Sequence, residues 1–221
     1  MSEVNTVELE REEMEVDVVI IGGGSAGLSC ALRMAQEIET HNQAVQDGTK
    51  QGDVIEDPMI VVLEKAAEVG AHSLSGAVLN PIALKELIPN YKELNCPINA
   101  DVNKESFYYL GESFSLKSPI VPPPFHNKGN HIISISQFNR WLGEQAEAKG
   151  IHLFAGFAAV EVLMDGEKVI GVRTGDRGLD KDGKPKDNFE AGMLIKSKIT
   201  VFSDGTRSPL LKRVAKKLGL R

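Results

Sequence analysis

A short apolar run followed at once by a glycine-rich turn constrains the fold of this chain more than any other feature. Residues 16–21 are mostly β-branched and apolar, as a parallel strand buried on both faces should be. Gly22, Gly24 and Gly27 follow with the spacing Gly-x-Gly-x-x-Gly. Residues 28–38 are rich in Ala, Leu, Met and Gln, which favour a helix. Strand, glycine turn and helix in this order predict a dinucleotide-binding βαβ unit.

Each glycine of this turn has a separate physical role. Gly22 allows the tight turn, and Gly24 lets the backbone approach a pyrophosphate without a Cβ in the way. Gly27 lets the helix pack closely on the strand, and the helix N-terminus offers free N–H groups to the phosphates. A glycine turn without a ligand is the alternative, and the correct flanking elements argue against it.

A second apolar run, residues 59–63, ends in Glu64. In this fold an acid at that place accepts hydrogen bonds from the ribose hydroxyls of the adenosine half. The gap from the glycine turn is about twice the usual ~20 residues, and polar residues 41–58 account for the excess as a surface insertion. Glu64 ending a strand without a ligand is the alternative. The fingerprint alone does not separate FAD from NAD.

The middle of the chain predicts a second lobe. Scattered prolines and aromatics run to residue 130, and residues 107–110 and 113–116 predict a hairpin across Gly111-Glu112. Pro122-Pro123-Pro124 predicts a stiff extended link. We expect 1–13 to be a disordered acidic tail, 14–80 and 131–221 to form the cofactor domain, and 81–130 to be the inserted lobe and crossover.

The last ninety residues return to the pattern of the cofactor domain. Residues 132–135 predict a strand, 137–149 an amphipathic helix and 151–154 a parallel strand. Residues 160–163 and 169–173 flank Asp165-Gly166 as a hairpin, and 174–190 are predicted as a charged loop. A buried strand at 198–202 ends in Ser203-Asp204-Gly205, and Ser208-Pro209 predicts a capped helix start.

The stretch after Glu64 resembles a known family. Residues 65–79, KAAEVGAHSLSGAVL, are similar to the segment after the ribose acid in electron transfer flavoprotein–ubiquinone oxidoreductases. The resemblance covers nearly the whole chain from Arg11 and includes residues 84–89, 122–130, 141–148, 156–162, 181–186 and 216–221. The family's usual turn, Gly-Ala-Gly-Pro-Ala-Gly, has Gly23 and Ser25 at its variable places here, and its usual Ala-Glu-Gly is Ser203-Asp204-Gly205.

The resemblance implies an α/β, FAD/NAD(P)-binding Rossmann-like fold of the glutathione-reductase/hydroxylase type with part of a second lobe inserted. It also implies that Gly70, Ser75, Gly76 and Ala77 lie close to the flavin. No side chain is expected to act as a catalytic acid, base or nucleophile or as a metal ligand, and we assign His72 no chemistry. The predicted FAD-binding residues are Gly22, Gly24, Ser25, Ala26, Gly27, Glu64, Lys65, Gly70, Ser75, Gly76, Ala77, Asp204 and Gly205.

For function, the resemblance implies an oxidoreductase that passes electrons from reduced electron transfer flavoprotein, through FAD and a [4Fe–4S] cluster, to ubiquinone at a membrane surface. The chain has two cysteines and no Cys-x-x-Cys, so it cannot hold that cluster by itself. We therefore expect an amino-terminal fragment, incomplete at its carboxyl end and inactive in isolation. The acidic start favours the cytoplasmic face of a bacterial inner membrane over the mitochondrial matrix face.

Two other functions remain open from the sequence. The chain could belong to another FAD-dependent reductase or monooxygenase of the same fold, or it could be a non-catalytic FAD-binding remnant. The residue 70–79 string and the lack of a second glycine fingerprint for a nicotinamide argue against the first. The net charge of −6 provides no support for a nucleic-acid partner, which generally requires a basic surface.

Overall fold

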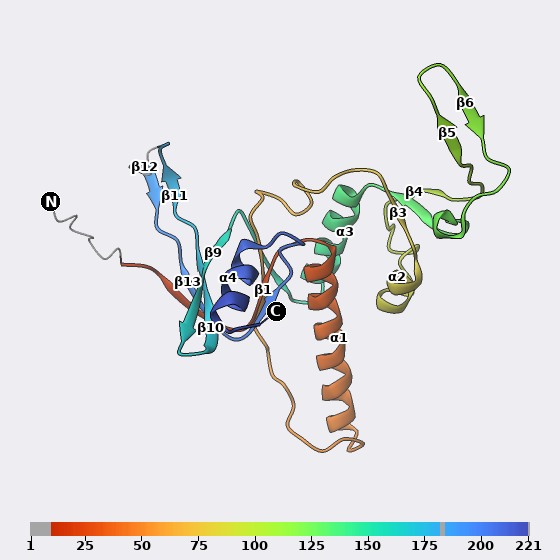
Figure 1. Cartoon of the computed structure of the whole chain (residues 1–221). Coiled ribbons are helices and arrows are strands. Elements are labelled where there is room, and N and C mark those ends of the chain that lie inside the picture. Colours follow the sequence, from red (N-terminus) through yellow and green to blue (C-terminus); the bar gives the residue numbers. More distant parts are fainter. Residues whose placement is uncertain (1–9, 182–183, 221) are drawn as a thin grey trace.

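The computed structural model describes residues 10–181 and 184–220, and its central element is a six-stranded sheet (Figure 1). The strand order is β8-β2-β1-β13-β10-β9. β8, β2, β1 and β13 are parallel, and β10 and β9 continue the sheet antiparallel. The strands are β1 (Glu13–Ile21), β2 (Ile60–Glu64), β8 (His152–Ala155), β9 (Ala159–Asp165), β10 (Lys168–Thr174) and β13 (Leu194–Phe202). The predicted α/β fold with a parallel sheet is confirmed.

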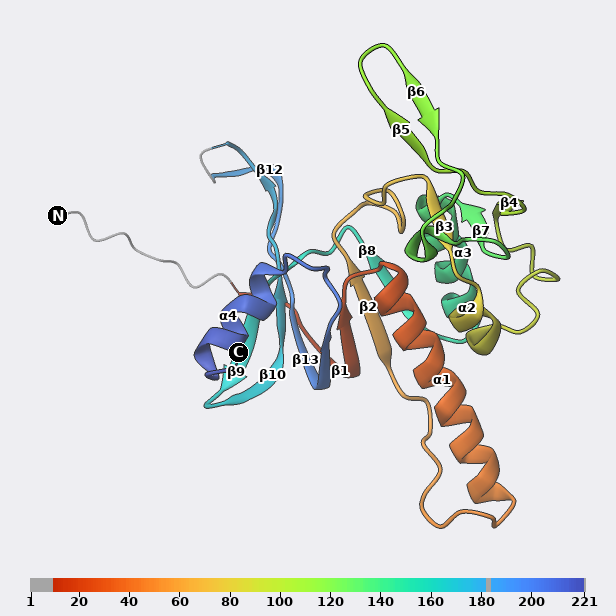
Figure 2. The same cartoon turned by 45° about the vertical axis from the view of Figure 1, so that its right-hand side comes forward.

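The continuous apolar character of β1 is explained by burial on both faces. Val18 and Ile20 pack in one core with the helices α1 (Ser25–Gln46) and α3 (Ile135–Glu147). Val19 and Ile21 pack in a second core with residues of β10, β13 and the helix α4 (Pro209–Lys217). Figure 2 shows α1 and α3 on one side of the sheet and α4 on the other. Helices thus cover both faces, as a parallel sheet requires.

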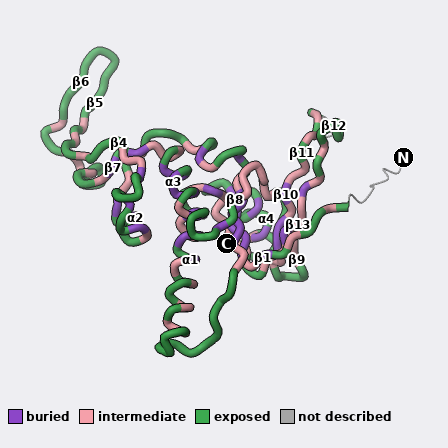
Figure 3. The backbone as a smooth tube through the Cα atoms, turned by 180° about the vertical axis from the view of Figure 1, so that it is seen from behind, coloured by how far each residue is buried: buried purple, intermediate pink, exposed green. Residues whose placement is uncertain are grey.

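A second, smaller lobe lies beside α1 and α3. Its three-stranded sheet has the order β3-β7-β4, and a separate hairpin, β5-β6, projects away from the molecule (Figures 1 and 2). The hairpin is mostly exposed in Figure 3, whereas the buried residues of the main sheet lie mainly in β1 and β2. The lobe elements are β3 (Ala77–Leu79), α2 (Ile82–Leu87), β4 (Ile98–Asp101), β5 (Tyr108–Leu110), β6 (Ser115–Lys117) and β7 (His131–Ile133). β3 and β7 therefore extend the lobe just beyond the predicted 81–130 segment.

Two expectations for the first sixty residues are corrected. Residues 1–9 of the predicted tail lie outside the described part, but Glu13 already belongs to β1 and Arg11 is bound to Asp176. Residues 11–13 of the predicted tail therefore belong to the folded part. The helix predicted to end at residue 38 continues to Gln46, because no helix-breaking residue occurs before Asp47 and Gly48. The predicted 41–58 insertion is thus partly helix.

Other boundaries are also corrected. The predicted 174–190 loop contains a hairpin of β11 (Arg177–Leu179) and β12 (Pro185–Glu190). The triple-proline segment, predicted as a stiff extended link, forms a 3-10 turn, η1 (Pro123–Phe125). Ile135, predicted as the end of a strand, is the first residue of α3, and the β9–β10 turn is Gly166-Glu167 rather than Asp165-Gly166. The predicted Ser208 cap is confirmed, since its side chain accepts from the Leu211 N–H.

Candidate functional site: a cleft at the carboxyl ends of three parallel strands

A cleft of about 410 Å³ lies where β1, β2 and β13 end. Because the three strands are parallel, their carboxyl ends meet at one edge of the sheet. In open α/β sheets ligands bind at this edge. The lining residues are Ile21, Gly22, Gly23, Gly24, Leu63, Glu64, Lys65, Gly70, His72, Ser73, Phe157, Ala158, Ala159, Ser203, Asp204, Gly205, Pro209 and Leu210.

The three fingerprint glycines differ in what surrounds them. Gly22 has φ +108°, and a Cβ there would lie 2.6 Å from the Ser203 carbonyl oxygen. A Cβ at Gly27 would lie 2.0 Å from the Gly22 carbonyl oxygen. A Cβ at Gly24 would have no described atom within 4 Å. Gly22 and Gly27 are thus required by packing within the protein, whereas Gly24 leaves open space where a ligand could approach the backbone.

The first turn of α1 begins directly behind Gly24. Gly24 is the N-cap and provides no side-chain hydrogen bond to the first helical N–H groups. The Leu28 N–H closes the first turn onto the Gly24 carbonyl at 3.0 Å. An uncapped helix N-terminus combines free donors with the positive end of the helix dipole. The turn can therefore bind an anion such as a pyrophosphate.

Glu64, at the end of β2, has a fixed carboxylate. Its Oε2 accepts from the Gly23 N–H at 3.0 Å, and its Oε1 accepts from the Ala66 N–H at 2.8 Å. A carboxylate offers about four acceptor positions, so two are left for a ligand. The side chain lines the cleft beside Lys65. It is oriented to accept hydrogen bonds from hydroxyl groups, as the ribose prediction requires.

The end of β13 is tied to both β1 and α4. The Ser203 hydroxyl donates to the Ile21 carbonyl at 2.8 Å, which joins the ends of the two strands. Asp204 accepts from the Ser208 hydroxyl at 2.5 Å, and Ser208 accepts from the Leu211 N–H at 2.9 Å. Gly205 follows with φ +91° and open space around its Cα. Asp204 and Gly205, both predicted FAD-binding residues, line the cleft. One carboxylate oxygen of Asp204 accepts the hydrogen bond from Ser208, the N-cap of α4.

The remaining predicted residues divide between the cleft and its surroundings. Gly70 lines the cleft, and a Cβ there would lie 2.4 Å from the Ser136 carbonyl oxygen of α3. Ser25 and Ala26 line a separate apolar groove beside α2 and α3. Gly27 is buried beneath the turn. Ser75, Gly76 and Ala77 are not among the lining residues, and Ala77 begins β3.

Several lining residues were not predicted as site residues. His72 and Ser73 come from the loop of residues 70–77. The others lie at the ends of β1, β2 and β13, follow β8, or begin α4: Ile21, Gly23, Leu63, Ser203, Phe157, Ala158, Ala159, Pro209 and Leu210. Phe157 and Ala158 reach the cleft because β8 lies beside β2, and residues that follow neighbouring parallel strands meet at the same edge of the sheet. The Arg177 guanidinium lies 4.0 Å from the Phe157 ring centroid and donates to the Gly156 carbonyl at 2.6 Å. Pro209 and Leu210 line the cleft because the N-terminus of α4 lies beside it.

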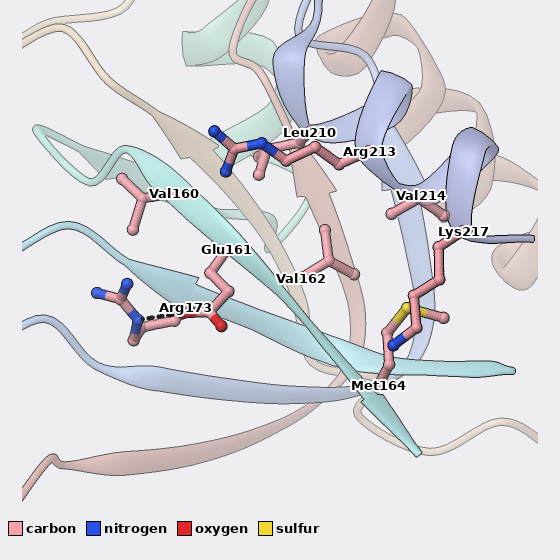
Figure 4. Close-up of a pocket in the computed structure, with 9 residues that line it drawn as sticks. All are labelled: Val160, Glu161, Val162, Met164, Arg173, Leu210, Arg213, Val214 and Lys217. Carbon is pink, nitrogen blue, oxygen red and sulfur yellow. Dashed lines mark hydrogen bonds and ion pairs between the residues drawn. The ribbon is translucent and has the colours of Figure 1, made fainter. Parts of the chain in front are cut away.

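A second pocket, of about 300 Å³, lies between β9 and α4 (Figure 4). Val162, Val214 and Leu210 provide much of its apolar lining, and Leu210 also lines the cleft. Glu161 and Arg173 also line this pocket, and the Arg173 Nε lies 2.8 Å from a Glu161 carboxylate oxygen. This pocket contains none of the predicted cofactor residues and is not the site that the glycine turn forms.

The cysteines do not suit an iron–sulfur cluster. Within residues 10–181 and 184–220, no group of three or more His, Cys, Asp or Glu side chains could hold a metal ion. The chain has only Cys30 and Cys96. Burial raises the pKa of the Cys96 thiol to about 11, which disfavours the thiolate that a metal requires. A cysteine-ligated cluster does not fit the residues present.

No protein-family model matches the chain, but curated proteins do. The chain is 42% identical over 217 residues, 97% of its length, to electron transfer flavoprotein–ubiquinone oxidoreductase, mitochondrial, of Homo sapiens. It is also 42% identical over 218 residues to a probable electron transfer flavoprotein–ubiquinone oxidoreductase of Acinetobacter baylyi. The predicted family resemblance is confirmed. The chain spans 33% and 36% of the length of these two oxidoreductases.

Solved structures with the same fold also match this chain. A geranylgeranyl bacteriochlorophyll reductase-like protein from Thermoplasma acidophilum matches with a TM-score of 0.57 at 17% identity, over 90% of this chain and 42% of that one. The flavin-dependent monooxygenase PieE, in complex with FAD and substrate, matches with a TM-score of 0.59 at 18% identity, over 93% of this chain and 32% of that one. At this identity the likeness supports the fold alone.

Proposed function

We propose that this chain binds FAD in the cleft at the ends of β1, β2 and β13. The observation that carries the proposal is the open space at Gly24, directly in front of the uncapped N-terminus of α1. Packing explains Gly22 and Gly27, but no described neighbour explains Gly24. A bound pyrophosphate accounts for it, because its oxygens must approach the backbone closely.

The residues around the cleft suit the parts of FAD. The Glu64 carboxylate can accept from ribose hydroxyls, and the first N–H groups of α1 can donate to the pyrophosphate. Gly70 and the resemblance of the 70–77 loop to the family favour this loop for the flavin half. Ser25, Ala26, Gly27, Lys65, Ser75, Gly76, Ala77, Asp204 and Gly205 remain proposed contacts or supports of this site.

We further propose that the intact protein transfers electrons from reduced electron transfer flavoprotein to ubiquinone. The proposal rests on the 42% identity to named relatives, which far exceeds the 17–18% identity to the flavin enzymes of similar fold. FAD supplies the redox chemistry when bound, and the chain's residues bind and orient it. The family's [4Fe–4S] cluster does not fit the two cysteines of this chain, so we assign it no ligand here.

The β5–β6 hairpin supports the proposal that the intact protein lies against a membrane surface. Tyr109, Leu110, Phe114 and Leu116 are 60%, 80%, 63% and 60% exposed. Aromatic and aliphatic side chains gathered on a projecting hairpin suit the interface between lipid headgroups and acyl chains. Within the described residues, no helix is sufficiently long and apolar to cross a bilayer.

The cofactor proposal is tested by an absorbance spectrum of the purified 221-residue chain, before and after addition of FAD. The supernatant after denaturation is then chromatographed to identify and quantify the flavin. Stoichiometric FAD is the expected result. A chain that folds but takes up no FAD, even after reconstitution, would contradict the proposal, and bound FMN in its place would contradict the role of the pyrophosphate site.

A further inference from the structure

A buried amide connects the two parts of the proposed FAD site. Asn139, on α3, is 2% exposed. Its Oδ1 accepts from the Ser25 hydroxyl at 2.6 Å, and its Nδ2 donates to the Ser73 hydroxyl oxygen at 2.9 Å. Ser25 is the first residue of α1, and Ser73 belongs to the 70–77 loop. The amide therefore bridges the pyrophosphate turn and the loop proposed for the flavin.

Both ends of the Asn139 side chain are needed for this bridge. An amide carries an acceptor and donors on one rigid plane, whereas an ionised carboxylate only accepts and an apolar side chain does neither. An unsatisfied buried polar group is costly, so the bridge also fixes the positions of its two serine partners. Nearby, Gly70 lies close to the Ser136 carbonyl of α3. α3 thus supports the loop at two neighbouring positions.

The directions of the two Asn139 hydrogen bonds leave the hydroxyl proton of Ser73 available. The Ser25 proton is used by Asn139, and an Asn139 proton is used by Ser73. In the described part of the chain, the Ser73 hydroxyl is recorded only as an acceptor, and Ser73 lines the cleft. Since a hydroxyl has one donor as well as acceptor positions, Ser73 can donate to a ligand oxygen in the cleft.

We propose that Asn139 is a positioning residue that orients Ser73 so that the Ser73 hydroxyl donates a hydrogen bond to the flavin half of FAD. This inference rests on the proposed FAD site and adds to it a residue that never touches the cofactor. Asn139 acts on FAD through Ser73, and its bond to Ser25 fixes the amide in the orientation that this action requires.

The test is a double-mutant cycle on the full chain, with FAD and ADP titrated separately by calorimetry. We expect Ser73→Ala and Asn139→Leu each to raise the Kd for FAD about tenfold, as a hydrogen bond of ~1.4 kcal/mol does. The double variant should lose little more than either single variant, because the two residues act as one unit. In Ser73→Ala the Kd for ADP, which lacks the flavin half, should stay within about twofold of wild type.

The circular dichroism of the bound flavin and a matched control complete the test. Asn139→Leu and Ser73→Ala should change the visible flavin signal in the same way. Gln145→Leu, which also replaces an amide by leucine on α3, should leave this signal and both Kd values unchanged. Equal losses of FAD and ADP affinity in Ser73→Ala, or additive losses in the double variant, would overturn the inference. Unchanged FAD affinity in Ser73→Ala would also overturn it. A folded wild-type chain that binds neither ligand would instead overturn the proposed function itself.

Discussion

The glycine turn after β1 and the β5–β6 hairpin use their residues in opposite ways. In the turn, Gly22 lies close to the backbone of Ser203, just after β13, and Gly27 of α1 lies close to the Gly22 carbonyl. Of the three fingerprint glycines, only Gly24 faces open space. In the hairpin, β5 and β6 pair with one another in a sheet of two strands, and their apolar side chains point outward. The Phe107 ring stacks on Phe125 at 5.5 Å, which anchors the hairpin at its base.

This contrast separates residues that build the protein from residues that face something outside it. Substitutions at Gly22 or Gly27 should damage the fold, because a side chain would meet backbone atoms there. Substitutions at Gly24 or at the exposed hairpin side chains should leave the fold intact and change only what binds. The following experiments test that separation.

The largest effect is expected for Gly24→Val. A Cβ at position 24 would have no described atom within 4 Å, so we expect the fold to persist. The valine would occupy the proposed pyrophosphate position and block the charged hydrogen bonds of the pyrophosphate to the helix N–H groups. We expect a loss of at least about 4 kcal/mol in FAD binding, measured by calorimetry. Gly27→Val is the contrasting variant, expected to lower the midpoint of thermal unfolding. Full flavin occupancy in Gly24→Val would remove the pyrophosphate from this turn.

The next effect concerns the hairpin. Replacing Leu110 and Phe114 together by Ser removes two exposed apolar side chains and should weaken binding to vesicles by about 3 kcal/mol, with FAD affinity and unfolding unchanged. Co-sedimentation with vesicles of phosphatidylcholine and phosphatidylglycerol measures the change. The paired control replaces Leu179 and Leu211, which are exposed elsewhere, by Ser. Equal losses in both double variants would mean that the hairpin has no special part in membrane binding.

A smaller effect is expected for Glu64→Ala within the cleft. Loss of a charged hydrogen-bond acceptor should weaken FAD binding by about 2 kcal/mol, as measured by titration. Glu68→Ala removes the same charge from an exposed ion pair with Arg140 and should leave FAD affinity unchanged. If Glu64→Ala bound FAD as tightly as wild type, the ribose hydroxyls would have to be bound elsewhere.

The smallest effect concerns the ion pair that ties Arg11, near the start of the described residues, to Asp176. The Arg11 guanidinium, 2.5 Å from Asp176, lowers the pKa of that carboxyl from its ordinary 3.8 to about 2. Asp176→Asn should therefore lower the free energy of unfolding at pH 7 by about 1 kcal/mol. A lowered folded-state pKa stabilises fully above about pH 4, and this stabilisation is lost as the pH falls toward 2.

Urea unfolding at pH 7 and pH 3 measures this difference for wild type, Asp176→Asn and the exposed control Asp187→Asn. The free energy of unfolding of wild type should exceed that of Asp176→Asn by less at pH 3 than at pH 7. Asp187→Asn should match wild type at both pH values. A larger difference between wild type and Asp176→Asn at pH 3 than at pH 7 would contradict the role of the Arg11–Asp176 pair.

The parts of the fold that the sequence predicted well depend on local signals. The first βαβ unit was recognised because an apolar strand, three spaced glycines and a helix follow one another directly. Ser208 and Pro209 marked the start of α4 for the same reason. Glu64 and Asp204 were placed at strand ends, and the parallel sheet brings those ends to one cleft.

The parts that were missed depend on neighbours far along the chain. β11 and β12 form an exposed hairpin with a register shift, so their charged side chains show no apolar alternation. The end of α1 is also polar and exposed, which resembles a loop in sequence. Asn139 gave no signal, because its importance comes from the rotation of α3 that directs it toward Ser25 and Ser73. The cleft residues after β8 required knowledge of which strand lies beside β2.

The pairing of β1 with β13 has a consequence for how the protein is made. Glu13 lies opposite Leu194 in the parallel register, so the strand synthesised first pairs with the strand synthesised last. At ~5–20 residues per second, β1 waits on the order of 10–40 s on the ribosome for that partner. During this interval one edge of an apolar strand is unpaired and open to association with other chains. Efficient production should therefore depend on chaperones that bind the nascent chain before residue 194 emerges.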